Sequence, residues 1–278
     1  MSDTIAEGIA KRGINRVENG EISVVSDDIA VESAHAIYIQ HRDNHILFSN
    51  TLCTPSDLAD LCRGMLWSEN VLPDYDSQAY TDLKINCDSI SSTAIISSEI
   101  NIDIANTNRL QSATPSCGLC GRETVAEVIA LLNGRESNTT ISISVEEIVA
   151  TSKKVHREQP MFALTGGVHA AALVEKGGNV SFLREDVGRH NAVDKVLGAC
   201  IANSCQPSDF GILFLSGRAG LELMHKAAIS GIEIVISIGA PTSMAVDVAR
   251  ATNITLVGFV KENSLNIYTN PHRIVDNH

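Results

Sequence analysis

The chain has 278 residues and a mass of 29.7 kDa, with 44% hydrophobic and 4% aromatic residues. This length and composition predict a globular α/β protein of one large or two unequal domains. The net charge of −12 argues against a protein that follows a nucleic-acid backbone. No apolar run approaches the roughly 18 residues of a membrane span, and no apolar leader opens the chain, so we expect a cytoplasmic protein.

The distribution of charge and the spacing of the cysteines indicate where a ligand would bind and whether the thiols are reduced. Residues 1–160 carry 12 Lys and Arg against 23 Asp and Glu, whereas residues 161–278 carry 9 against 10. A small anionic ligand is therefore expected to bind the nearly neutral second half. The seven cysteines show no spacing typical of a secreted disulfide framework, which favours reduced thiols.

The first 112 residues predict a β-rich module after a short tail. Residues 1–20 are polar and are expected to form a poorly ordered tail. Strand patterns follow at Ile22–Val25, Ala36–Gln40, His45–Phe48, 80–86 and 93–104. A helix is expected from Thr54 onward, with an apolar stripe of Leu58, Leu61, Cys62 and Met65. Cys53 and Cys62 are expected in the core.

Two cysteines two residues apart, Cys117 and Cys120, mark the most reactive stretch of the sequence. Glycines flank them, and a helical pattern begins at Arg122, so the pair lies at or before a helix N-terminus. The dipole and Arg122 would favour the thiolate, which is the attacking form of cysteine.

Several interpretations of this pair stay open from the residues alone. A structural pair needs no chemistry, and half of a zinc site would require a second pair at suitable spacing. A thioredoxin-like motif would be expected nearer the start of the fold. A zinc deaminase has a Pro-Cys-x-x-Cys signature with an upstream His-x-Glu, but no His-x-Glu precedes this pair.

The second half predicts an α/β domain with several loops suited to an anion. A helix is expected at Val145–His156, and a Gly pair beside His169 interrupts the apolar run 162–174. A strand at Val180–Leu183 leads through the charged residues 184–191 into another helix. Such junctions at strand ends are common ligand sites in α/β proteins.

The last seventy residues alternate between strand and helix. The predicted strands are 211–215, 232–238 and 255–260, and the predicted helices are 220–230 and 243–253. This alternation predicts βαβ units and a parallel sheet. The loops at 216–218 and 239–243 would present N–H groups at helix N-termini to an anion, such as one that bears a phosphate. His225 and Lys226 are expected on the surface.

Five motifs in one order identify a resemblance to the formate dehydrogenase accessory sulfurtransferase family, FdhD. The motifs are Ser-Cys-Gly-Leu-Cys-Gly at 116–121, Thr-Gly-Gly-Val-His-Ala-Ala at 165–171, Glu-Asp-Val-Gly-Arg-His-Asn-Ala-Val-Asp-Lys at 185–195, Ser-Gly-Arg at 216–218 and Thr-Leu-Val-Gly-Phe at 255–259. The resemblance runs from about Ile22 to Ile274 and is strongest after Thr114. It implies a cytidine deaminase-like α/β/α domain over 113–278, preceded by the smaller β-rich module at 21–112.

The resemblance also implies a function. Such a protein is a sulfur carrier that accepts persulfide sulfur from a cysteine desulfurase. It delivers this sulfur to the bis-molybdopterin guanine dinucleotide cofactor (Mo-bis-MGD) for the catalytic subunit of formate dehydrogenase. By resemblance Cys117 carries the persulfide, and Cys120 either relays the sulfur or resolves the persulfide.

The cofactor site is expected in the second half. By resemblance its binding segment is Phe259, Val260, Lys261, Glu262, Asn263 and Ser264. Arg189, His190, Arg218 and His169 join it as candidate contacts. No resident metal is expected, and a homodimer is compatible with the sequence. The alternative function is a non-catalytic cofactor chaperone in which the cysteines only dock a partner, and a divergent zinc deaminase is the third.

Overall fold

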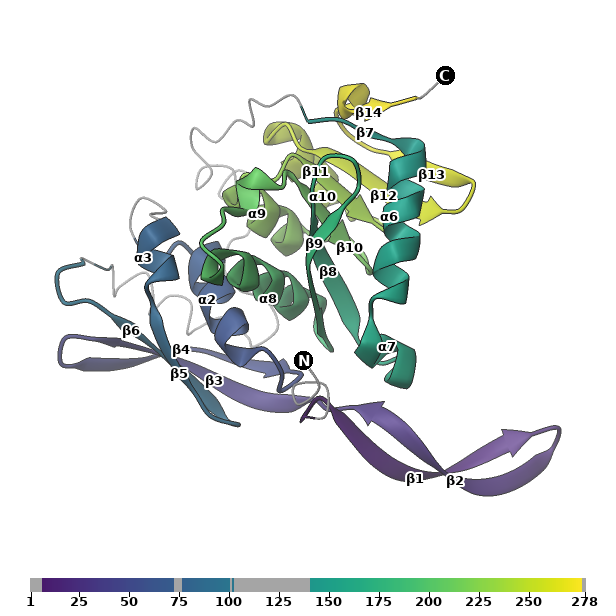
Figure 1. Cartoon of the computed structure of the whole chain (residues 1–278), viewed down its shortest axis with the longest axis horizontal. Helices are drawn as coiled ribbons and strands as arrows, with labels where there is room; N and C mark the ends of the chain where they lie inside the picture. Colours follow the sequence, from purple (N-terminus) through teal and green to yellow (C-terminus); the bar gives the residue numbers. More distant parts are fainter. Residues whose placement is uncertain (1–6, 73–76, 101, 103–140, 277–278) are drawn as a thin grey trace.

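The computed structural model describes residues 7–72, 77–100, 102 and 141–276 (Figure 1). Its strands are β1 (Ile9–Glu18), β2 (Glu21–Ala30), β3 (Ser33–His41), β4 (Asn44–Cys53), β5 (Lys84–Cys87), β6 (Ser91–Ile96), β7 (Ile143–Ser144), β8 (His169–Val174), β9 (Val180–Asp186), β10 (Ile212–Leu215), β11 (Ile234–Ser237), β12 (Thr255–Lys261), β13 (Ser264–Ile267) and β14 (Ile274–Val275). Its helices are α2 (Leu58–Ser68), α3 (Ser77–Thr81), α6 (Val145–Arg157), α7 (Pro160–Thr165), α8 (Arg189–Ala202), α9 (Leu221–Ile229) and α10 (Ser243–Ala251), with 3-10 turns η2 (Pro207–Asp209) and η3 (Pro271–Arg273).

A six-stranded mixed sheet forms the centre of the second half, in the order β13-β12-β11-β10-β8-β9. Strands β10, β11 and β12 are parallel, as the alternation of strands and helices predicts. The other strands of the sheet, β8, β9 and β13, each run antiparallel to the neighbour through which they join it. Short hairpins join β8 to β9 and β12 to β13, and a hairpin places its two strands antiparallel. Neither hairpin changes the pattern of apolar residues in the strands that it joins.

Helices cover both faces of this sheet, which confirms an α/β fold (Figure 1). Ile148 and Val155 of α6 pack on one face, against strand residues such as Phe214 and Ile236. Helices α8, α9 and α10 pack on the other face, where strand residues such as Leu215 enter the larger core. Side chains alternate along each strand, so a single strand supplies both cores.

A second sheet of four strands, in the order β4-β3-β6-β5, belongs to the first hundred residues. Helix α2 packs between this sheet and α8, and its expected apolar positions Leu61 and Cys62 are fully buried. Two glycines allow close helix contact: a Cβ on Gly64 would strike the backbone of Asp194, and one on Gly198 would strike the backbone of Asp60. One continuous core therefore joins both parts of the chain.

The predicted disorder of residues 1–20 is wrong for the described part of that segment. Residues 9–18 form β1, which pairs with β2 over ten residues in an antiparallel ribbon that projects from the body (Figure 1). Both faces of the ribbon are largely exposed, as Val17 and Val24 show with exposures of 65% and 81%. A strand that is exposed on both faces does not need alternating apolar and polar residues. The alternation by which a strand is recognised is therefore missing from residues 9–18.

Two further local expectations are corrected by the structure. Tyr80 lies in the short helix α3 instead of opening a strand, and β5 begins only at Lys84. The Tyr80 hydroxyl donates to Leu66 O at 3.2 Å and accepts from Leu72 N at 2.9 Å, so contacts with α2 and the chain after it hold this helix. Among the described helices, none is both long enough and apolar enough to cross a membrane.

Candidate functional site

Strand directions bring the predicted motifs to one edge of the six-stranded sheet. The parallel strands β10, β11 and β12 all end there, and β9 ends there too because two antiparallel steps separate it from β10. Antiparallel β8 begins at this edge with His169, which pairs with Asp186 at the end of β9. Helices α8, α9 and α10 follow these strands, so their N-termini also meet at this edge, called here the carboxyl edge.

Buried ionic contacts hold the junction between β9 and α8. The Lys195 ammonium lies 2.6 Å from Asp186 Oδ2, and both side chains are completely buried. Asp186 also accepts hydrogen bonds from Thr54 N at 3.0 Å and Gly188 N at 2.7 Å. Much of the charged 185–195 motif is therefore internal structure that fastens the carboxyl edge to the chain after β4.

Glu185 fixes the position of α7 at the same edge. Its carboxylate accepts the backbone N–H groups of Met161 at 3.0 Å and Phe162 at 2.8 Å, where the first turn of α7 lacks intrahelical partners. Burial raises the pKa of Glu185, while these two hydrogen bonds favour its ionised form. The contact holds Phe162 and the glycine loop after α7 beside the sheet.

His169, Arg189 and His190 form a cationic and imidazole cluster at the carboxyl edge. Burial and the nearby Arg189 lower the pKa of His169. Burial, followed by Arg189 and Lys226, lowers the pKa of His190 to about 3, although Glu222 lies 3.5 Å from its Nε2. Both imidazoles are therefore neutral at pH 7, and arginine supplies the positive charge. The buried Nε of Arg189 has no hydrogen-bond partner in the described part of the chain.

The loops after β10 and β11 support each other beside this cluster. The Ser237 hydroxyl donates to Gly217 O at 2.7 Å, and Gly239 N donates to the same carbonyl at 3.0 Å. Gly217 lies close against His169, since a Cβ on this glycine would lie 3.1 Å from His169 Nδ1 and the imidazole would have to shift. Arg218 is exposed at this loop, and no side chain of the described residues caps the N-terminus of α8 or α9. Exposed cations and uncapped N–H groups are suited to an anion.

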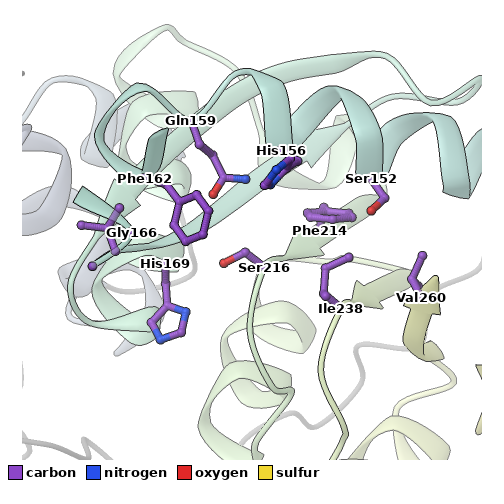
Figure 2. A pocket seen from close by; sticks show the side chains of 12 residues that line it. Ser152, His156, Gln159, Phe162, Gly166, His169, Phe214, Ser216, Ile238 and Val260 are labelled. Atoms are coloured by element: carbon purple, nitrogen blue, oxygen red, sulfur yellow. The ribbon is translucent and has the colours of Figure 1, made fainter. Parts of the chain in front are cut away.

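A cavity of about 540 Å³ opens between α6, α7 and the carboxyl edge (Figure 2). Among the described residues that line it, none is Lys, Arg, Asp or Glu; they are Ser152, His156, Gln159, Phe162, Gly166, Gly167, Val168, His169, Phe214, Ser216, Ile238 and Val260. Figure 2 shows the His169 ring pointing away from Phe162 and Phe214, so this residue lies at the border of the cavity. Arg189 lies close enough to His169 to lower its pKa. The cavity thus joins a chamber of mixed polar and apolar lining, without Lys, Arg, Asp or Glu, to a cationic rim.

The predicted binding segment 259–264 is divided between the cavity and the surface. Val260 lines the cavity, whereas Phe259 is 41% exposed and has a positive φ of 52°. Lys261, Glu262, Asn263 and Ser264 are exposed at the β12–β13 hairpin. The acid in this segment is neutralised, since Lys153 of α6 contacts Glu262 at 2.5 Å and lowers its pKa.

The structure brings only part of the predicted site together. Cys117 and Cys120 lie outside the described residues. Of the described cysteines, Cys53, Cys62 and Cys200 are buried, and burial raises the pKa of Cys53 to about 12. Within the described ranges, no cluster of three or more His, Cys, Asp or Glu is arranged to hold a metal ion.

Several cavity residues were not expected from the sequence. His156 and Phe162 pack edge to face with ring centroids 5.8 Å apart, and Gln159 is 4% exposed. His156 also begins a His-x-Glu sequence, but it lies downstream of the cysteine pair and not before it. Glutamine is usually exposed, so no signal in the sequence predicted that Gln159 would be buried at this cavity.

The expectation that His225 and Lys226 lie on the surface is wrong. Lys226 is 3% exposed and contacts Asp194 Oδ1 at 2.8 Å, and Ser68 donates to the same carboxylate at 2.7 Å. Burial raises the pKa of Asp194, while the Asp194 charge raises that of Lys226. This buried pair holds α9 against α8 and α2 behind the cluster.

Comparisons with known proteins give a consistent family. The model of the FdhD/NarQ family matches residues 30–275. The chain is similar to the sulfur carrier protein FdhD of Picrophilus torridus, with 36% identity over 255 residues that cover 90% of this chain and 93% of the other. It is also 37% identical to the protein of the same name from Thermoplasma acidophilum over 270 residues, covering 95% and 93% of the two chains.

A solved structure has the same fold. A protein from Desulfotalea psychrophila, assigned as a formate dehydrogenase accessory protein, superposes with a TM-score of 0.75 and 21% identity. The match covers 96% of this chain and all of the other. At this identity the likeness concerns the fold alone.

Proposed function

Because the chain belongs to the FdhD/NarQ family, we propose that it is a sulfur carrier for formate dehydrogenase. In this proposal it accepts persulfide sulfur from a cysteine desulfurase and transfers it, as a sulfurtransferase, to the Mo-bis-MGD cofactor in the cytoplasm. The cofactor is then received by the catalytic subunit of formate dehydrogenase. The name sulfur carrier protein, given to relatives with 36% and 37% identity, supports the sulfur part of the proposal.

One structural observation carries the cofactor part. A neutral cavity of about 540 Å³ opens beside a rim that holds Arg189, Arg218 and uncapped helix N-termini. The proposed cargo combines flat heterocycles with pyrophosphates. The aromatic walls at Phe162 and Phe214 are suited to a flat ring, and the rim is suited to the phosphates. Cavity and rim together match both parts of such a molecule.

Sulfur transfer in this proposal begins at Cys117. Its thiolate attacks the terminal sulfur of the desulfurase persulfide, a new S–S bond forms on Cys117, and the desulfurase cysteine leaves as a thiolate. The pKa values of Cys53, Cys62 and Cys200 are raised by burial, so these thiols stay protonated and are poor competitors for the sulfur. Cys120 either relays the sulfur or displaces it by forming a disulfide with Cys117.

Intact mass after incubation with a cysteine desulfurase and cysteine tests the sulfur step. Wild type and Cys87→Ala, which removes an exposed cysteine, should gain one sulfur mass that a reductant removes. Cys117→Ala should gain none. If wild type gains no sulfur from an active desulfurase, the persulfide step is refuted. The alternative, a non-catalytic cofactor chaperone with docking cysteines, would then replace it.

Guanosine diphosphate, the nucleotide half of the proposed cargo, tests the cavity and rim independently. Arg189→Ala and Arg218→Ala should each weaken its binding by roughly 10–100-fold in calorimetry, since a charged hydrogen bond contributes about 1.5–3 kcal/mol. Arg250→Ala removes an exposed arginine from the far end of α10 and should leave affinity unchanged. Unchanged affinity in Arg189→Ala and Arg218→Ala would contradict the rim assignment.

The finer architecture belongs to the same proposal. We propose that residues 113–278 form a cytidine deaminase-like domain preceded by the module at 21–112. The layered arrangement of α6, the mixed sheet and helices α8–α10 supports this classification. A homodimer is compatible with it.

A further inference from the structure

The wall of the cavity between α6 and α7 contains a buried amide, the side chain of Gln159. This residue lies between the last residue of α6 and the first of α7 and is only 4% exposed. Its Nε2 donates to Val155 O at 3.0 Å. Because a backbone carbonyl can only accept, this bond fixes which end of the amide is the nitrogen. The oxygen, Oε1, is therefore the end that is left for other contacts.

The amide oxygen of Gln159 is open to the cavity. Among the described residues, no group donates a hydrogen bond to it. Figure 2 shows it pointing into the space that Ser216 and the Phe162 ring also border. An amide oxygen has two lone pairs and can accept two hydrogen bonds. A nearly buried acceptor of this kind is suited to donors that a ligand brings into the cavity.

Ser216 adds a donor to the same space. Its Oγ accepts from Ala170 N at 2.8 Å, and its own N–H donates to Ala170 O at 3.0 Å, so the residue is held in place by β8. The hydroxyl proton takes no part in these two bonds and can be donated to a ligand. Among the described lining residues none carries a formal charge as Lys, Arg, Asp or Glu. The cavity thus presents a double acceptor and a donor to a polar but uncharged ring.

The Phe162 ring and the Gln159 amide are both held in position before a ligand arrives. Glu185 accepts the Phe162 N–H at 2.8 Å, and the Phe162 ring packs edge to face on His156 at an angle of 64°. The backbone carbonyl of Gln159 accepts from Ala163 N at 2.9 Å, which ties the residue to α7. A site whose groups are already oriented loses little conformational entropy on binding.

We propose that Gln159 is the specificity-determining residue of this cavity and selects a flat heterocycle in which an amino group stands beside a ring N–H. This inference rests on the proposed function. Guanine and pterins share such an edge: the amino group and the ring N–H can both donate to the Gln159 oxygen, and the next ring carbonyl can accept from Ser216. Hypoxanthine lacks the amino group, and adenine has a bare ring nitrogen in place of the ring N–H. A site built to accept these N–H groups disfavours rings that lack one of them.

Calorimetry of the full chain with three nucleotides tests this role. Guanosine, inosine and adenosine diphosphate (GDP, IDP and ADP) carry the same ribose and phosphates, so contacts at the cationic rim cancel in the comparison. Wild type should bind GDP roughly five- to tenfold more tightly than IDP or ADP, the fold-change that one neutral hydrogen bond provides.

The variant Gln159→Met keeps the length of the side chain, removes its polar atoms and should lose the preference for GDP over IDP. Val155 O still accepts from Glu158 N at 3.2 Å in this variant, so no carbonyl is left without a donor. Gln40→Met makes the same change at an exposed position of β3 and should keep the wild-type preference. If Gln159→Met fails to fold, as circular dichroism would reveal, the comparison of nucleotides in wild type still decides.

Guanosine and hydroxymethylpterin, both without phosphate, distinguish the two possible rings. The one that binds wild type more tightly is the ring that the cavity holds, and its affinity should fall roughly five- to tenfold in Gln159→Met. Equal affinity of wild type for GDP and IDP, or a preference that persists in Gln159→Met, would overturn the role of Gln159 and leave the proposed cofactor site intact. If none of these ligands binds wild type, both are refuted, whereas the mass measurement at Cys117 reports on the sulfur step separately.

Discussion

The neutral state of His190 is a consequence of its surroundings at the carboxyl edge. Its side chain is 23% exposed, and burial together with Arg189 and Lys226 places its pKa at about 3. The ordinary value of 6.5 returns when the chain unfolds. Between these two values the unfolded chain binds a proton that the folded chain does not bind. The contribution of His190 to stability is therefore complete above pH 6.5 and is lost as the pH falls toward 3.

We expect wild type to lose about 2–4 kcal/mol more unfolding free energy than His190→Gln between pH 6.5 and 3.5. Glutamine keeps a polar side chain of similar length but does not titrate in this window. Urea unfolding at a series of pH values measures the difference. Parallel profiles for wild type and His190→Gln would show that the site does not hold a neutral imidazole.

At the scale of single elements, α6 is the wall of the cavity and the most fully capped helix of the described chain. The Ser144 hydroxyl accepts from Glu147 N at 3.2 Å, and the Glu147 carboxylate accepts from Ser144 N at 2.7 Å. Glu146 and Glu147 lie in the first turn and Lys154 in the last, so the charges complement the helix dipole. These local signals explain why the sequence predicted this helix nearly residue for residue.

Removal of the α6 cap should destabilise the protein without changing the cavity chemistry. Ser144→Ala should lower the unfolding free energy by about 1 kcal/mol, because Glu147 N then lacks its acceptor. Ser98→Ala, at an exposed position outside any helix, should change it by less than about 0.5 kcal/mol. Chemical denaturation of both variants gives the comparison. Equal stabilities would mean that the cap contributes nothing measurable.

At the scale of the whole molecule, contact between α2 and α8 joins the first hundred residues to the cavity-bearing half. Gly64 and Gly198 allow the two backbones to meet, since each added Cβ would strike the opposite helix. The buried ion pairs of Asp186 with Lys195 and of Asp194 with Lys226 flank this contact on α8. The carboxyl edge is therefore supported by residues from both halves.

Gly198→Ala should separate these helices and lower the unfolding free energy by about 3 kcal/mol or more, because backbone atoms cannot move aside as side chains do. The matched control is Gly13→Ala in the β1–β2 ribbon, where nothing lies within 4 Å of the added Cβ. Thermal unfolding of both variants measures the effect. A Gly198→Ala protein as stable as Gly13→Ala would show that the helices are not in close contact.

Local patterns in the sequence determined much of this protein. The apolar period identified α6 and the strands β10, β11 and β12, and the order of five motifs identified the family. Strand ends rich in glycine and charge also indicated where a site would form. Each of these signals is contained in neighbouring residues, because helix and strand periods, caps and turn residues act over only a few positions.

Only the tertiary structure decided which distant residues meet. It paired the exposed ribbon strands, set the directions of β8 and β9, and buried Lys195 and Lys226 beside acids. It also formed the cavity from α6, α7 and residues at or near the ends of β8, β10, β11 and β12. A charged side chain is buried only when a partner from another part of the chain compensates its loss of water, and strand direction depends on the connection and not on the strand's own residues. No short stretch of sequence records these pairings.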